Sequence, residues 1–490
     1  MNLLKKYKNI PVHIKASFWF LICAFFQKGI SVLTTPIFTR VLSTEEYGQF
    51  NVFNSWQNII AIFVSMYLYA GVYSQGVIKF SKERNKFSSS MQGLTLTLVS
   101  FWTLIYLIFK DFCNYLFSLN TKQMLLMMLM IWTTAVFNFW AYEQRAQIKY
   151  KNLVILTIIV SILKPLVSII LIFNLNDKVL ARIIGLAIVE LIAYFGLFIA
   201  QMNKGKQFFN WKYWKYALKF NIPLIPHYLS QVVLASSDRI MISKLVGNNQ
   251  AGIYSLAYSL SLIMTLFNSA LMQTLSPWIY EKIKKKEIKD MSSVGYISLI
   301  GIAIANLLLI LFAPELIKIF APKGYYETIW VIPPISMSVF FMYCYDLFAK
   351  FAFYQEKTKT IMLVSVIGAI LNIALNYIFI PRFGFIAAGY TTLICYLVYS
   401  IGHYILMRNI CKNSFDGYYP YSTKILLEIS LIFMGLDFIF MITYNYIILR
   451  YLIVVIILIL LIKNKNMIYK EGKRIFIIRK GEKNVRKEEI

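Results

Sequence analysis

Residues 153–173 read LVILTIIVSILKPLVSIILIF, and this long, mostly apolar run decides the fold. It carries a single charged side chain, Lys164, which stands beside Pro165. A helix of this length is about long enough to cross a hydrocarbon slab of roughly 30 Å. Inside that slab every backbone amide must find a partner within its own segment. The run is therefore predicted to be a transmembrane helix.

Runs of the same kind recur along the whole chain. Of its 490 residues 59% are hydrophobic and 15% are charged, too few polar groups for the surface of a soluble protein of this size. The alternating pattern of an outer-membrane barrel is absent. We predict an all-α integral membrane protein with about fourteen transmembrane helices. The predicted spans are Ala16–Phe38, Gln49–Val72, Met91–Phe109, Met124–Tyr142, Leu153–Phe173, Ile183–Met202, Asn221–Ser243, Gly252–Trp278, Val294–Phe312, Ile329–Ala352, Ile361–Ile380, Ile386–Met407, Ile425–Met441 and Ile447–Ile462.

The basic residues gather on one side of the predicted membrane. That side receives the lysines before residue 16, the lysine-rich loops at 204–219 and 282–289, and the tail from Lys463 onward, whereas the opposite loops hold isolated cases. This imbalance predicts an even number of spans with both termini in the cytoplasm. It also explains the net charge of +28 without nucleic acid, which we do not expect as a partner. The Lys-, Asn- and Ile-rich composition favours a bacterial chain, multi-pass in the cytoplasmic (inner) membrane.

The chain also repeats itself. Two stretches resemble each other at a constant offset of 204 positions. The first is Thr39-Arg40-Val41-Leu42-Ser43 with Tyr47-Gly48, and the second is Ser243-Lys244-Leu245-Val246-Gly247 with Ala251-Gly252, so that Gly48 corresponds to Gly252. Gln27 and Gln231 share this offset. Two six-helix bundles related by an axis along the membrane normal are predicted. The expected domains are an N-lobe (1–205), a C-lobe (206–415), two further helices (416–462) and a basic cytoplasmic tail (463–490).

Motifs of catalysis are missing from the sequence. There is no GxxxxGK[ST], HExxH or GxSxG, no long extracytoplasmic loop, and no CxxC among the five cysteines. We predict a carrier rather than an enzyme, with no cofactor and no metal site.

Ionisable groups inside the predicted spans are the candidate functional residues, because each costs about 2.5–3.5 kcal/mol at the bilayer centre. Lys28 and Lys164 lie near the middle of their spans and predict a cationic, water-filled cavity. Such a cavity suits a pyrophosphate, whose lost water the ammonium groups would replace. The predicted substrate-binding residues are Lys28, Lys164, Gln27, Gln231 and Arg239. The predicted gate or ion-pair residues are Arg40, Asp238, Asp346, Lys350 and Glu190.

Several of these charges have simpler explanations. Asp346 and Lys350 stand four apart, where they can neutralise each other on one helix face. Arg40 can be an interfacial anchor, and Asp238 or Arg239 a structural ion pair. Four further polar residues are expected to be solvated at the cytoplasmic boundary: Glu143, Arg145, His403 and Glu428.

Three segments carry a resemblance to a known family. They are Gln27-Lys28-Gly29-Ile30 through Pro36 to Glu46-Tyr47-Gly48, then Ser237-Asp238-Arg239-Ile240-Met241-Ile242-Ser243 with Ala251-Gly252-Ile253-Tyr254-Ser255, and Ile380-Pro381-Arg382-Phe383-Gly384-Phe385-Ile386-Ala387-Ala388-Gly389. Over about residues 10–460 the chain resembles bacterial polysaccharide-repeat-unit flippases of the multidrug/oligosaccharidyl-lipid/polysaccharide (MOP) exporter superfamily.

The resemblance implies two six-helix lobes around a central cavity, as in MATE exporters, with two added C-terminal helices. It implies an undecaprenyl-pyrophosphate-linked oligosaccharide as cargo, and a cavity cation on the first helix, where Lys28 matches. Arg40 lies further out than that pattern requires.

We therefore expect a flippase for capsule, O-antigen or exopolysaccharide assembly. Its expected partners are the lipid-linked oligosaccharide, membrane lipids, and polysaccharide polymerase and chain-length machinery. One alternative is a cation-coupled multidrug exporter of the same fold, in which acidic cavity residues should dominate. The other is a membrane polysaccharide polymerase or ligase, which usually displays a long catalytic loop.

Overall fold

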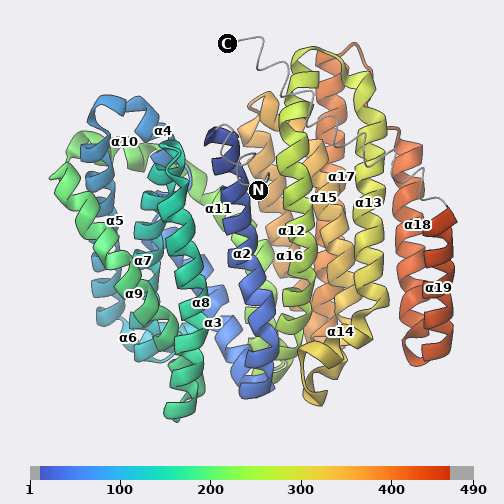
Figure 1. Ribbon diagram of the computed structural model, residues 1–490, viewed down its shortest axis with the longest axis horizontal. Helices are drawn as coiled ribbons and strands as arrows, with labels where there is room; N and C mark the ends of the chain where they lie inside the picture. Colours follow the sequence, from blue (N-terminus) through green and yellow to red (C-terminus); the bar gives the residue numbers. More distant parts are fainter. Residues whose placement is uncertain (1–11, 464–490) are drawn as a thin grey trace, which may run out of the picture. The chain divides into compact units, whose positions relative to one another are not determined.

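The computed structural model describes residues 12–463, and within that range every regular element is a helix. A few side chains inside the range, that of Lys28 among them, lie outside the described part. The long helices (Figure 1) are α2 (Val12–Val41), α3 (Thr44–Val64), α5 (Arg84–Ile108), α7 (Thr121–Ala146), α8 (Tyr150–Asn174), α9 (Lys178–Gly205), α11 (Ile225–Leu245), α12 (Asn248–Lys284), α13 (Met291–Leu311), α15 (Ile332–Tyr354), α16 (Thr358–Phe383), α17 (Ile386–Ser414), α18 (Thr423–Ile442) and α19 (Ile447–Lys463).

Shorter helices connect them. These are α4 (Val72–Lys79), α6 (Lys110–Phe117), α10 (Trp211–Asn221) and α14 (Ala313–Phe320), with 3-10 turns at Ser81–Glu83, Ile222–Leu224, Ile288–Asp290, Lys323–Trp330 and Thr443–Asn445.

Each predicted span overlaps one of the long helices, and the predicted all-α membrane fold is confirmed. Ten of the described helices are long and apolar enough to cross a membrane by length and composition alone. Helix α19 is apolar but shorter, and α2, α3 and α11 fall outside the ten. In α11 the charges of Asp238, Arg239 and Lys244 explain the lower hydropathy. Polar helices of this kind need protein or water beside them rather than lipid.

One predicted span is too long. The run Gln49–Val72 was expected to be a single helix, but α3 ends at Val64 and α4 begins at Val72. Between them Met66 and Tyr67 both adopt left-handed backbone, with φ of 49°. A helix cannot continue through such residues, and the apolar composition of the segment conceals the break.

Side-chain caps fix where several helices begin. Ser43 accepts a hydrogen bond from the Glu46 amide while Glu46 accepts one from the Ser43 amide, a capping box at the start of α3. Asn120 and Gln123 form the same arrangement at α7. Asp177 caps α9 through the Leu180 amide. These caps satisfy backbone donors that would otherwise be unpaired. They also set the ends of three neighbouring helices at one end of the bundle.

Packing divides the chain into two units, one ending at Gly252 and the other beginning at Ile253. In the first, α8 packs against α9 and α2, and α11 packs against α3. The predicted lobes follow the sequence repeat and the units follow packing, so the two divisions differ in where α10 and α11 belong. The lobe boundary near residue 205 stays a prediction.

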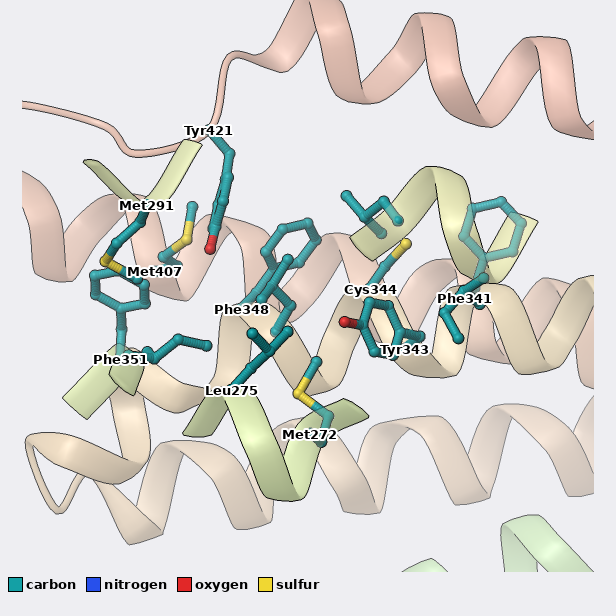
Figure 2. Packing of buried hydrophobic residues seen from close by; sticks show 14 of the residues in the cluster. Met272, Leu275, Met291, Phe341, Tyr343, Cys344, Phe348, Phe351, Met407 and Tyr421 are labelled. Atoms are coloured by element: carbon teal, nitrogen blue, oxygen red, sulfur yellow. The ribbon is translucent and has the colours of Figure 1, made fainter. Parts of the chain in front are cut away.

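The second unit is built around α15, which packs against α13 and α17. Figure 2 shows the core that these helices share with α12 and with Tyr421, just before α18. The labelled side chains in it are Met272, Leu275, Met291, Phe341, Tyr343, Cys344, Phe348, Phe351, Met407 and Tyr421. This apolar core holds α15 in a fixed position, and with it the charged pair that α15 carries.

Candidate functional site

Lys164 and Glu190 meet inside the N-terminal unit. The Lys164 Nζ atom of α8 lies 2.6 Å from the Glu190 Oε1 atom of α9. The Thr133 hydroxyl of α7 donates to Glu190 Oε2 at 2.7 Å. The side chain of Glu190 is 5% exposed and that of Lys164 is 28% exposed. Three helices thus share one neutralised charge pair, and each oxygen of the buried carboxylate has a donor.

A second polar network, which sequence reasoning missed, crosses the same unit. Gln201 donates to Glu143 at 2.9 Å, and Gln92 donates to Gln201 at 2.6 Å. Gln147 donates to the other oxygen of Glu143 at 3.1 Å. The prediction that Glu143 is solvated is wrong, since the residue is only 5% exposed. Its carboxylate is stabilised by amide donors in place of water. Glutamines near the ends of the predicted spans Met91–Phe109 and Ile183–Met202 were the available signal.

Arg182 is another functional group that the sequence reading passed over. Its guanidinium carbon lies 3.7 Å from the ring centre of Phe38 and 3.5 Å from that of Phe50. The cation is thus sandwiched between an aromatic ring of α2 and one of α3. Arg182 lies one residue before the predicted span at Ile183, and the candidate residues were sought inside the spans. A planar guanidinium suits such stacking better than an ammonium does.

Charged groups at the same end of the unit connect its loops. Lys178 lies 4.0 Å from Glu46 and donates to the Val41 carbonyl at 3.3 Å. Arg40 donates to the Pro36 carbonyl of its own helix at 2.8 Å and is exposed. Lys244, its equivalent in the repeat, donates to the Leu116 carbonyl at 2.6 Å. These contacts fit the anchoring role weighed for Arg40.

A cavity of about 730 Å³ opens beside these loops. By the predicted topology this end of the unit is extracytoplasmic. Its lining is mostly polar and includes Gln49, Tyr115, Asn120, Gln123, Asp177, Ser243, Lys244 and Asn248.

Two glycines related by the sequence repeat meet where α3 crosses the start of α12. A Cβ atom on Gly48 would lie 1.9 Å from the Asn248 carbonyl oxygen, and one on Gly252 would lie 2.0 Å from the Thr44 carbonyl oxygen. Thr44 and Asn248 are themselves 204 positions apart, so the contact is the same from either side. The Thr44 hydroxyl also bonds the Asn249 side chain. Only glycine permits this backbone approach.

Arg239 connects α11 to α3 near this crossing. Its Nη1 atom lies 3.4 Å from the Ser55 hydroxyl and 3.3 Å from the Ala235 carbonyl oxygen. Asp238 beside it is buried, with 2% of its surface exposed. The pair of charges therefore lies within the helical packing of the N-terminal unit and not in a loop.

The remaining predicted substrate-binding residues lie on α2 and α11. Gln27 is exposed and Gln231 is half-buried. Lys28 belongs to α2, but its side chain lies outside the described residues. Whether Lys28, Lys164 and Arg239 share one cavity stays a prediction.

In the second unit Asp346 and Lys350 form the ion pair expected from their spacing, with 3.7 Å between carboxylate and ammonium. Their side chains are 30% and 14% exposed.

His403 of α17 is 1% exposed and packs edge-on against Tyr399, so the expectation that it is solvated is wrong. Its helix turns that face inward, onto α15 and α16.

The C-terminal helices carry a buried ion pair of their own. Arg450 of α19 pairs with Glu315 of α14, and the Tyr451 hydroxyl donates to the same carboxylate at 3.2 Å. Nearby on α18, Asp437 is fully buried, and neither of its oxygens has a hydrogen-bond partner among the described residues. An arginine inside an otherwise apolar span was the signal for the Arg450 pair.

Helix α10 holds a tyrosine outside the membrane spans. The Tyr213 hydroxyl donates to Glu83 at 2.7 Å, and the Trp214 ring nitrogen donates to the Ser90 carbonyl at 3.0 Å. Burial, together with the Glu83 carboxylate, raises the pKa of Tyr213 to about 12. The phenol keeps its proton and its bond at physiological pH, so Tyr213 fastens α10 to the 3-10 turn at Ser81–Glu83, while Trp214 fastens it to α5.

These arrangements define a multi-pass helical membrane protein that holds several charged pairs within its bundles. A family model described as "Polysaccharide biosynthesis protein" matches residues 14–283, more than half of the chain. The chain belongs to this family. A second model, MatE, matches residues 223–378.

Two curated relatives come from Haemophilus influenzae. "Lsg locus putative protein 1" is 24% identical over 206 residues, which are 41% of this chain and 51% of that protein. The match thus spans about half the length of that relative. An "Uncharacterized membrane protein" is 22% identical over 383 residues, which are 73% of this chain and 88% of that protein.

Solved structures share the fold. The lipid II flippase MurJ in its inward closed conformation matches with a TM-score of 0.70 at 17% identity, over 91% of this chain and 99% of that one. An inward-facing multidrug resistance MATE transporter of the MOP superfamily matches with a TM-score of 0.61 at 13% identity, over 79% of this chain and 95% of that one. The resemblance to polysaccharide-type MOP proteins is therefore confirmed at the level of family and fold.

Proposed function

We propose that this protein moves a polyprenyl-pyrophosphate-linked oligosaccharide across the bacterial cytoplasmic membrane for capsule, O-antigen or exopolysaccharide assembly. The observation that carries the proposal is membership of the polysaccharide biosynthesis family combined with the fold that a lipid II flippase also has. A protein of that fold with several charges within its helices is suited to passing a charged head group while the lipid tail stays in the bilayer.

In this proposal Lys28, Lys164 and Arg239 contact the phosphates, with Gln27 and Gln231 beside them. The ion pair with Glu190 gives Lys164 a resting partner, so the cargo phosphate would replace the carboxylate. Ammonium and guanidinium groups are suited to that exchange because they bind phosphate oxygens through charge-assisted hydrogen bonds. Arg40, Asp238, Asp346 and Lys350 would act as gate or ion-pair residues.

The pair Lys28→Ala and Lys28→Arg tests the charge role. At equal protein level, Ala should abolish surface polysaccharide and Arg should restore it, because Arg keeps the positive charge. Full polymer with Ala would remove Lys28 from the site.

Deletion of the gene tests the function itself. A strain without the flippase should accumulate lipid-linked repeat units on the cytoplasmic side. A strain that instead exports single units would lack a polymerase, and this result would contradict the proposal.

A multidrug exporter is the second candidate, favoured by the MatE match over residues 223–378. Drug-susceptibility profiling separates the two: increased sensitivity to cationic drugs in the deletion strain, with unchanged polysaccharide, would favour the exporter.

A further inference from the structure

A cavity in the second unit is built from tyrosines around an arginine. Its volume is about 510 Å³, and its walls come from the start of α13, the end of α17 and the segment that leads into α18. Four of the lining residues carry the argument below: Tyr404, Arg408, Tyr419 and Thr423.

Arg408 is held in place by its neighbours. Its guanidinium carbon lies 4.2 Å from the ring centre of Tyr419, and its Nη1 atom donates to the Thr423 hydroxyl at 3.2 Å. The hydroxyls of Tyr404 and Thr423 lie 2.6 Å apart. A guanidinium has five N–H donors. Thr423 and the hydroxyls of Tyr419 and Tyr404 engage some of these donors, and the others remain for an anion.

The wall opposite is rigid. Tyr421 is 1% exposed and packs in the core against Phe348, and a Cβ atom on Gly295 would lie 2.4 Å from its ring. The Ser422 amide donates to the Tyr296 hydroxyl at 2.6 Å, which fastens the segment before α18 to α13. The cavity is therefore a formed part of the fold.

The charge around the cavity is positive. Its lining contains Arg408 and no carboxylate, and Lys289 lies nearby with its ammonium 5.3 Å from the Tyr418 ring centre. Two neighbouring acids are paired elsewhere, Asp290 with Lys282 at 2.8 Å and Glu428 with Lys424 at 4.0 Å, and a third, Asp416, precedes the lining residue Gly417 and is exposed to solvent. A cation is therefore disfavoured as occupant and an anion is favoured.

The cavity also lies at the membrane surface. Three candidate spans, Ile288–Leu311, Ile386–Ser414 and Thr423–Asn445, have one end at it. Tyrosines concentrate at this depth because one end of the ring is apolar and the other is wet. Ile425 of the lining is 38% exposed and Ile405, next to Tyr404 in α17, is 53% exposed, so acyl chains have apolar side chains to cover near the cavity.

We infer that this cavity, which we call the Arg408 pocket, binds the phosphate of an anionic phospholipid head group. The guanidinium donates to the phosphate oxygens together with the one hydroxyl proton that the hydrogen bond between Tyr404 and Thr423 leaves over, and the tyrosine rings cover the rest of the head group. The predicted topology places the pocket in the cytoplasmic leaflet, where anionic lipids gather. The inference needs no assumption about the transported cargo.

The test uses the full-length protein in nanodiscs of phosphatidylcholine with a minor fraction of phosphatidylglycerol. Lipids that remain bound after detergent exchange are counted by native mass spectrometry. The parent should retain phosphatidylglycerol preferentially, and Arg408→Gln should lower that preference about tenfold, since charge-assisted hydrogen bonds to phosphate are lost. Lys412→Gln is the matched control: it removes the same charge from an exposed site one helical turn further along α17.

A second arm replaces the lipid with inorganic phosphate in pure phosphatidylcholine nanodiscs. A rise in melting temperature of the parent but not of Arg408→Gln would show a phosphate site filled from solution instead of from the bilayer. No Arg408-dependent effect in either arm, or an equal loss with Lys412→Gln, would overturn the inference. Should Arg408→Gln fail to fold, Thr423→Val, which removes the hydroxyl partner, provides the same comparison.

Discussion

Lys164 and Glu190 show how a single residue can keep its charge within a membrane bundle. Either ion alone would be strongly destabilising in a medium of low dielectric constant. The pair is tolerated because Lys164 Nζ lies 2.6 Å from Glu190 Oε1 and the Thr133 hydroxyl donates to Glu190 Oε2. A phosphate that binds Lys164 would have to displace the Glu190 carboxylate from it, so the two anions would compete for the same ammonium group.

Replacing Glu190 by Gln should destabilise the protein by up to roughly 3–5 kcal/mol, because the half-buried Lys164 charge is then left without its counter-ion. The double variant Lys164→Met with Glu190→Leu should recover most of that loss. Thermal unfolding in detergent measures both, with exposed Lys151→Met as the control. A Glu190→Gln protein as stable as the parent would show that the ion pair is not needed for folding.

Arg182 offers a sharper comparison between two cations. Lysine keeps the charge but cannot stack flat between Phe38 and Phe50. We expect Arg182→Lys to cost about 0.5–2 kcal/mol of stability, the range of a cation–π contact. Chemical unfolding of the two proteins gives the difference. Equal stability would assign the role of Arg182 to its charge alone.

At the residue scale, the sequence indicated which charged residues lie inside the helices, but not which residues they pair with. Lys164 stood out because it interrupts an apolar run, but Glu190 lies on another helix, and only packing brings the two together. Glu143 and His403 were misjudged for a related reason. Their distance along the span from the membrane boundary was visible, whereas the helix face they occupy was not.

At the scale of elements, the crossing of α3 and the start of α12 brings two backbones into close approach. The sequence repeat pointed to Gly48 and Gly252 as equivalents, and the structure brings these two into mutual contact. The positions of the spans were predictable because an apolar run of this length can satisfy its backbone hydrogen bonds in a bilayer only as a helix. The end of α3 was not, since the left-handed backbone at Met66 and Tyr67 leaves no mark on hydropathy.

Gly252→Ala should therefore separate α3 from α12, since its Cβ atom would lie 2.0 Å from a backbone oxygen that cannot move freely. We expect a loss of stability of about 1–3 kcal/mol, typical of overpacking, and reduced surface polysaccharide. Gly196→Ala on α9 is the control, because nothing lies within 4 Å of its Cβ position. If both variants behaved like the parent, the crossing would not be a fixed contact.

At the scale of the whole molecule, the distribution of basic residues predicts which side each loop faces. In a cysteine-free background, Asn176→Cys between α8 and α9 should react with a membrane-impermeant maleimide in intact cells. Lys285→Cys between α12 and α13 should react only after the membrane is opened. Labelling of both from outside would refute the predicted topology.

The central claim is that the protein carries a lipid-linked saccharide through the bilayer, and transport by the purified protein tests it most directly. Proteoliposomes would contain undecaprenyl-pyrophosphate-linked saccharide with a fluorescent label on the sugar, and dithionite added outside would bleach the outer leaflet. With the protein present the signal should decay to near zero, as inner-leaflet lipid crosses and is bleached. A signal that stops at the level of protein-free vesicles, with folded protein present, would contradict the account.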